Sequence, residues 1–63
     1  MIGLELASPL LESKDVAKWL CVSEATLSRW RAINEGPRWV NLGGLIRYHR
    51  ADVEAYLEGN RRG

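Results

Sequence analysis

The 63-residue sequence predicts a small α+β domain built from two short helices, a β-hairpin and a third helix. Three observations favour this fold. Two helical patterns, each preceded by a serine, are separated by only three residues; two β-prone runs flank the pair Gly43-Gly44; and a third helical pattern ends at Gly59. A chain of this length buries only about 60% of its unfolded surface, so the core must be small. Multidomain, barrel and dinucleotide-binding folds are excluded by length.

The composition is that of an ordered domain, with 46% hydrophobic and 27% charged residues. No apolar run approaches the roughly 20 residues of a membrane span, and the N-terminus lacks the pattern of a signal peptide. We therefore expect a cytoplasmic protein, with no membrane partner.

The core must be made by side chains alone. A lone Cys21 forms no internal disulfide, and with a single His49 it is too few ligands for a zinc site. We expect Trp19, Trp30 and Trp39 to supply most of the buried volume, because each is large enough to bury about 150 Å² or more.

The first helix is predicted over residues 14–20, with Ser13 as its N-cap. Val16, Trp19 and Leu20 recur at the spacing of one helical face. Because this stretch contains no helix breaker, the pattern predicts a short but complete helix.

The second helix is predicted from Glu24 to about Asn34, with Ser23 as its N-cap. Leu27 and Trp30 form its apolar stripe. The run 35–37 ends it, because its glycine provides a left-handed cap and its proline cannot continue a helix.

Two turn lengths are possible for the hairpin of residues 39–48. A two-residue turn places Val40 and Leu42 opposite Arg47 and Leu45, which mixes the faces. A three-residue turn over 43–45 places Val40, Leu42, Ile46 and Tyr48 on one face. We expect the three-residue turn, because a small core needs the whole strand face.

The third helix is predicted over Arg50–Glu58, with Gly59 as its stop. The expected organisation is an N-terminal arm over 1–12, one domain over 13–59 and a polar tail over 60–63.

Two short helices joined by a three-residue turn have the geometry of the helix-turn-helix that reads DNA. Ala17 is small enough for the helices to cross closely, and Cys21 occupies the turn position that is usually left-handed. The charge supports this interpretation, since residues 25–50 carry five arginines against a single acid. Arginine makes forked hydrogen bonds to phosphate and guanine, although such a run also occurs on solvated surfaces.

Residues 13–57 together resemble a known family, the excisionase and AlpA-type group of small winged-helix proteins related to the MerR DNA-binding domain. The matching segments are DVAKWL (15–20), VSEATL (22–27), RW (29–30), GP (36–37), VNLGG (40–44), IRY (46–48) and ADVEAYL (51–57). The resemblance implies a winged helix-turn-helix that binds double-stranded DNA and has no catalytic site. Two residues depart from the family pattern: Cys21 replaces the usual glycine, and Leu45 replaces a basic residue at the tip of the hairpin, or wing.

The outward face of the second helix is the expected base-reading surface. A helical wheel with Leu27 and Trp30 inward places Arg29 outward, in reach of guanine O6 and N7, and the small neighbours allow close approach. The alternative interpretation of Arg29 is a solvated arginine on an exposed helix face. The other expected contacts on this helix are Ala25, Thr26, Ser28 and Ser23, the last as a phosphate ligand, a cap, or both.

Arg38 and Arg47 are expected to meet the sugar-phosphate backbone. Gly43, Gly44 and Leu45 form a wing tip that enters the minor groove, where Leu45 wedges a base step or packs on a neighbouring protomer. Arg31 and Arg50 are assigned to structure. No metal or cofactor is expected.

Four functions compete at this point. By resemblance, an excisionase, or recombination directionality factor, binds repeated sites beside a phage attachment site, cooperatively with further copies of itself, and bends the DNA so that the phage integrase favours excision. A small AlpA-type transcriptional regulator would use the same surface on one promoter. An adaptor would instead bind proteins through Leu45 and Ile33. An enzyme is least expected, since there is no nucleophile–base pair, carboxylate pair or metal set.

Overall fold

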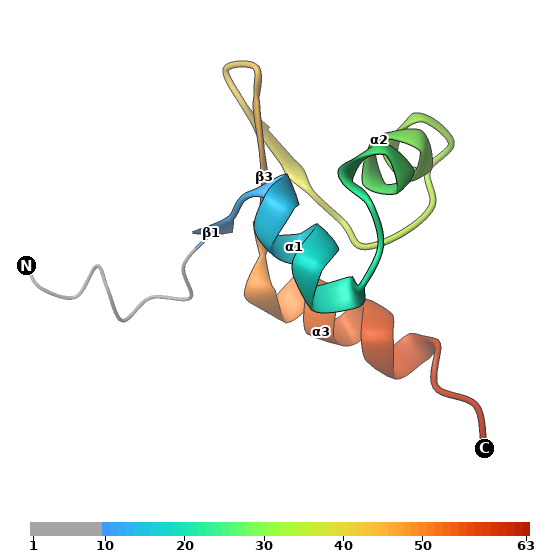
Figure 1. Ribbon diagram of the computed structural model, residues 1–63. Coiled ribbons are helices and arrows are strands. Elements are labelled where there is room, and N and C mark those ends of the chain that lie inside the picture. Colours follow the sequence, from blue (N-terminus) through green and yellow to red (C-terminus); the bar gives the residue numbers. More distant parts are fainter. Residues whose placement is uncertain (1–9) are drawn as a thin grey trace, which may run out of the picture.

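A computed structural model describes residues 10–63 and has three helices and a small sheet (Figure 1). Residues 1–9 of the expected N-terminal arm lie outside the described part. The predicted order of helices and hairpin is confirmed, and a short first strand is added. The elements are β1 (Leu10–Leu11), α1 (Ser13–Leu20), α2 (Glu24–Ala32), β2 (Val40–Leu42), β3 (Leu45–His49) and α3 (Arg50–Gly59).

Helix α1 begins one residue earlier than predicted, because Glu12 and not Ser13 is its N-cap. The backbone of Glu12 is extended, with φ −86° and ψ 163°, and its N–H donates to the Asp15 carboxylate at 3.2 Å. A carboxylate three residues after the cap satisfies a backbone donor at the helix start, as in a capping box. Ser13 is therefore free to use its hydroxyl elsewhere.

The turn between α1 and α2 follows the prediction closely. Cys21 is left-handed, with φ 58° and ψ 41°, and the Val22 N–H donates to the Ala17 carbonyl at 2.9 Å. Ser23 caps α2, since its hydroxyl accepts from the Thr26 N–H at 3.0 Å. The turn and the cap thus set the connection of a helix-turn-helix, and Val16, Ala17 and Leu27 pack the two helices into one core.

Helix α2 ends at Ala32, short of the predicted Asn34. The residue that leaves the helix in a left-handed conformation is Asn34, with φ 60°, and the next N–H, from Glu35, donates to the Trp30 carbonyl at 2.8 Å. Gly36 is left-handed too, with φ 80°, but it has a different task. A Cβ there would lie 2.7 Å from Trp30 Cε3, so glycine is required for the loop to pass over the indole.

The sheet is three-stranded and antiparallel, in the order β1-β3-β2. The predicted hairpin register is wrong, because Leu42 pairs with Leu45 across a two-residue turn and Val40 pairs with Arg47. Gly43 and Gly44 both have positive φ, 60° and 96°, which is the backbone that a two-residue turn requires.

The hairpin β2–β3, called the wing below, projects beyond the helices (Figure 1). Its core-facing side carries Ile46 and Tyr48, while Leu42 and Leu45 on the other side are 50% and 56% exposed. Burial therefore does not set the register at the wing tip, defined as residues 42–45. The turn does.

The core consists of few side chains. Those that are completely or almost completely buried and largest are Val16, Leu27, Tyr48 and Val53. The prediction that three tryptophans fill the core is wrong for two of them, because Trp19 and Trp39 are 38% and 37% exposed. Trp30 is half-buried, and its ring lies 5.8 Å from that of Tyr56 on α3.

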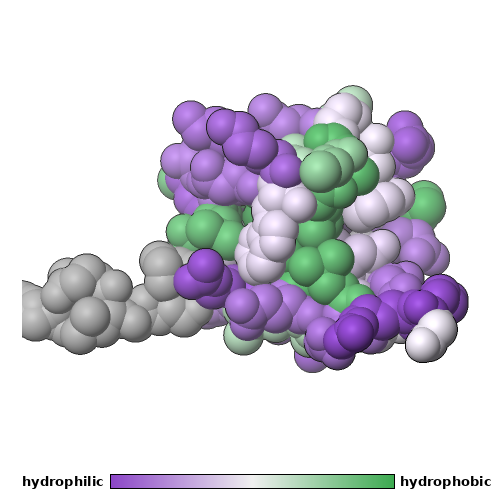
Figure 2. Space-filling model, turned by 60° about the horizontal axis from the view of Figure 1, so that its bottom comes forward, coloured by the Kyte–Doolittle hydropathy of each residue, from purple (hydrophilic) through white to green (hydrophobic). Residues whose placement is uncertain are grey.

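The surface away from the wing tip carries an apolar strip between hydrophilic side chains (Figure 2). Leu57 of α3 and Trp19 of α1 are among the large apolar side chains exposed on the domain. None of the helices within residues 10–63 has the length and apolar character to cross a bilayer.

Candidate nucleic-acid interface

The outward face of α2 has the composition predicted for base reading. Ala25, Ser28, Arg29 and Ala32 are all exposed on this helix. Within residues 10–63, the Arg29 guanidinium makes no hydrogen bond or ion pair. A free guanidinium among small side chains can approach a groove closely and present two parallel donors.

The N-terminus of α2 is already organised by its cap. Ser23 Oγ accepts from the Thr26 N–H and lies 3.0 Å from Thr26 Oγ1, so the two hydroxyls are engaged with one another. Thr26 is half-buried, whereas Ser23 and Ala25 are exposed. The cap interpretation of Ser23 is thus confirmed, and the first-turn N–H groups still favour an anion at this end of the helix.

The wing tip is uncharged and open. A Cβ at Gly43 or Gly44 would meet no atom within 4 Å, and the Gly44 N–H donates to Asn41 Oδ1 at 2.7 Å. Leu42 and Leu45 lie opposite each other beside these glycines. The tip therefore offers apolar contact and a bare backbone, and the polar side chain of Asn41 lies just before it.

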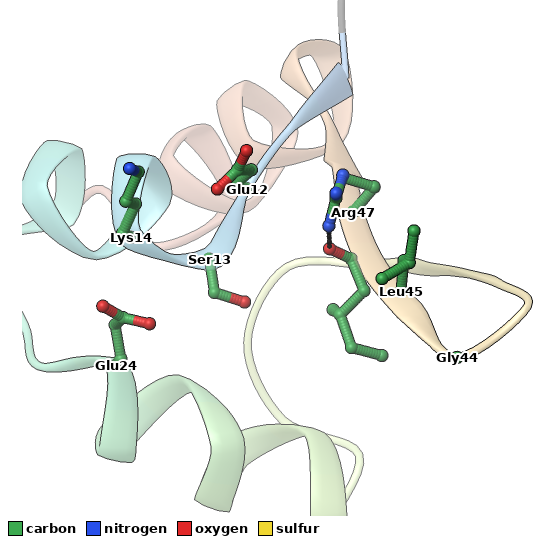
Figure 3. Close-up of a pocket in the computed structure, with 8 residues that line it drawn as sticks. Glu12, Ser13, Lys14, Glu24, Gly44, Leu45 and Arg47 are labelled. Carbon is green, nitrogen blue, oxygen red and sulfur yellow. Dashed lines mark hydrogen bonds between the residues drawn. The ribbon is translucent and has the colours of Figure 1, made fainter.

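Arg47 lies on the outer face of the wing and is half-buried. Its Nη1 donates to the Ile46 carbonyl at 2.7 Å, which holds the side chain against its own strand (Figure 3). The remaining guanidinium donors stay available to a phosphate.

A hollow separates the wing from the first turns of α1 and α2 (Figure 3). Two cations, Lys14 and Arg47, and two acids, Glu12 and Glu24, line it. Lys14 is a candidate phosphate contact that the sequence analysis missed, because it lies in a stretch where acids outnumber lysines and only the fold brings it near the wing. The acids make this hollow a weak anion site by itself.

Arg38 is not brought to that hollow. It is exposed and lines a different one, against Asp52, Ala55 and Tyr56 of α3. Its backbone-contact role remains a proposal, and the nearby Asp52 carboxylate competes with phosphate for its charge.

Arg31 and Arg50 have internal partners, as their assignment to structure predicts. Arg31 donates to Tyr48 Oη and Ser13 Oγ, at 2.7 Å and 3.3 Å. Arg50 lies 3.8 Å from the Glu54 carboxylate, and its guanidinium carbon lies 5.9 Å from the centre of the Trp19 ring. In the described part of the chain no three His, Cys, Asp or Glu side chains gather as metal ligands.

A helix-turn-helix with a left-handed turn, followed by a glycine-tipped hairpin and a third helix, defines a winged helix-turn-helix protein. The chain belongs to the helix-turn-helix domain family, whose model matches residues 10–61. None of the curated proteins compared with the chain matches it. The family includes small DNA-binding proteins of the excisionase and AlpA type and is typically non-enzymatic, so the function of this domain is sequence-specific binding of double-stranded DNA.

Proposed function

We propose that the protein is an excisionase-type architectural DNA binder. It binds attachment-site DNA in several copies, bends the duplex and directs a phage integrase towards prophage excision. The observation that carries the proposal is the outer face of α2, where Arg29 projects between small side chains and has no hydrogen-bond or ion-pair partner among residues 10–63. This face enters the major groove, and the wing lies against the adjoining minor groove.

The wing tip favours an architectural role. Leu42 and Leu45 are exposed as a pair at the end of a projecting hairpin, where a charged residue would serve simple backbone attachment better. Apolar side chains in a minor groove partly unstack a base step and bend the duplex. A second use of the same leucines, against the neighbouring copy, is compatible with several copies binding side by side.

Binding in several copies is expected from the small size of the domain. A single module of this kind buries about 600–1,000 Å² on DNA, which gives modest affinity for one site. Copies on adjacent sites raise the effective concentration of each other, so cooperative binding is expected.

The second candidate is a small AlpA-type regulator bound to one promoter operator. The exposed apolar pair at the wing tip favours the first function, because apolar side chains in a minor groove bend the duplex. Footprinting separates them: several adjacent protected sites with bent DNA, and excision stimulated with integrase present, support the excisionase. A single unbent operator supports the regulator.

Arg29→Ala tests the base-reading role. It should weaken binding to a site selected from random duplexes by about 1–3 kcal/mol and relax the base preference there. Arg47→Ala should weaken selected and unrelated duplexes alike and reduce the log-log salt slope by about 1. Arg62→Ala is the matched control, since it removes the same charge from the exposed tail. Wild-type affinity in folded Arg29→Ala would refute the assignment, and salt-independent binding would favour the adaptor.

A further inference from the structure

We propose that Arg31 is a positioning residue that fixes the angle between α2 and the wing, so that both reach one duplex together. The inference rests on the proposed DNA binding and extends it to a residue that does not touch DNA. Two arginines of one helix then have different tasks. Arg29 reads bases, and Arg31 sets the direction of α2, which carries Arg29.

The contacts of Arg31 join three elements at one nitrogen. Its Nη1 donates to Tyr48 Oη of β3 at 2.7 Å and lies 3.3 Å from Ser13 Oγ of α1. The guanidinium carbon also lies 5.9 Å from the centre of the Trp39 ring, just before β2. Helix α2 is thus tied to α1, to β3 and to the segment just before β2.

The position of Arg31 on the helix keeps it from the duplex. Two residues correspond to a rotation of about 200°, so Arg31 and Arg29 lie on nearly opposite sides of α2. Arg31 is half-buried and Arg29 is exposed. The charge of Arg31 is therefore used inside the domain.

The acceptor on β3 is well placed to transmit orientation. Tyr48 is only 1% exposed, so its ring is fixed by packing and its hydroxyl has a defined place. The same strand continues through Arg47 to Leu45 at the wing tip. Apolar packing is non-directional and lets a helix rotate slightly on the core, whereas a hydrogen bond to a charged donor fixes a direction.

The release of Ser13 from the capping position completes the arrangement. Because Glu12 is the N-cap of α1, the Ser13 hydroxyl is left to accept from Arg31. The N-terminus of α1 lies between α2 and the wing, at the hollow that both elements line (Figure 3). A single guanidinium thus joins α2 to β3 and to the first turn of α1.

Tyr48→Phe tests the proposal, because it keeps the ring and removes the acceptor. Tyr56→Phe is the matched control: this half-buried ring also packs against α2, through Trp30, and within residues 10–63 its hydroxyl makes no hydrogen bond. For Tyr48→Phe we expect roughly tenfold weaker binding to the selected site, the size of one hydrogen bond to a charged group. Binding to an unrelated duplex of equal length should change less than about twofold, because loose electrostatic contact needs no fixed angle.

If the bond between Arg31 and Tyr48 has a purely structural role, a different result is expected. Tyr48→Phe then lowers the melting temperature but, at a temperature where the variant is fully folded, leaves the ratio of selected to unrelated affinity unchanged. An unchanged ratio in Tyr48→Phe, or an equal loss in Tyr56→Phe, would overturn the proposal. Arg31→Met, which keeps an unbranched apolar stem and removes the guanidinium donors, should reproduce the loss.

A measurement without DNA separates this proposal from the proposed function. Residual dipolar couplings of the amides of α2 and β3 should fit one alignment tensor in the wild type. In Tyr48→Phe the α2 couplings should be reduced relative to those of β3. If they are not, Arg31 does not set the angle, whatever the DNA result. If wild type selects no site but the couplings change as expected, the proposed function fails and the positioning role stands.

Discussion

Gly36→Ala is expected to be the most damaging of the glycine-to-alanine substitutions within residues 10–63, for two separable reasons. The first is backbone conformation: Gly36 has φ +80°, and a left-handed backbone costs an L-residue about 1–2 kcal/mol. The second is space, since the added Cβ would lie 2.7 Å from Trp30 Cε3 and 3.3 Å from Trp30 Cβ.

The indole has little freedom to give way. Its ring already packs against that of Tyr56, at 5.8 Å between centroids, and Trp30 belongs to the group packed on the core. Overpacking of this kind costs about 1–3 kcal/mol. With the backbone cost, Gly36→Ala should lose about 2–5 kcal/mol of unfolding free energy. That is most of the stability of a domain this small.

The control is the same substitution where only one of the two costs applies. Gly43 has φ +60°, and a Cβ there would meet nothing within 4 Å, so Gly43→Ala should lose only about 1 kcal/mol. Urea unfolding followed by tryptophan fluorescence measures both variants. If Gly36→Ala unfolds before the titration starts, Gly36→Asn against Gly43→Asn isolates the contact, because asparagine tolerates the left-handed backbone. Equal losses at positions 36 and 43 would refute the role of Trp30 in demanding glycine.

Two further predictions concern the turn of the helix-turn-helix. Cys21→Gly should raise the unfolding free energy by up to about 1 kcal/mol, because φ 58° is strained for cysteine and not for glycine; unchanged or lower stability in thermal unfolding would contradict this. Ser23→Ala should lower it by about 1 kcal/mol through loss of the cap to the Thr26 N–H, while Ser28→Ala on the same exposed face should change it by less than about 0.5 kcal/mol; equal effects in thermal unfolding would argue against the cap.

The fold follows from sequence wherever a local signal decides it. Ser23 as a cap, Cys21 in a left-handed turn and the three helices are encoded by residues within a few positions of each other, and all were predicted. The predicted hairpin register is wrong, because it requires a buried face along the whole strand. The wing extends past the core, so its turn and not its burial sets the pairing.

The other errors have a tertiary origin. Strand β1 has two residues and no period of its own, and it exists because the edge of β3 pairs with it. Trp19 and Trp39 look like core residues by type. Instead they lie at the surface beneath the guanidinium groups of Arg50 and Arg31.

The candidate site divides in the same way. The outward position of Arg29 follows from helix periodicity, and the turn at Gly43 and Gly44 follows from their type. The approach of Lys14 to the wing, and the separation of Arg38 from it, depend on how α1 and α3 pack. The spacing of residues in a single sequence does not indicate which of these side chains the fold brings near the wing. Base contact by Arg29 and backbone contact by Arg47 remain predictions.

The four largest fully buried side chains each belong to a different element, Val16 to α1, Leu27 to α2, Tyr48 to β3 and Val53 to α3. Every one of these elements therefore supplies a wall of the same enclosed space, and none can detach while the rest keeps its shape. Within residues 10–63, a substitution that displaces Val53 of α3 therefore also disturbs the packing of Leu27 on α2, the helix proposed to read DNA.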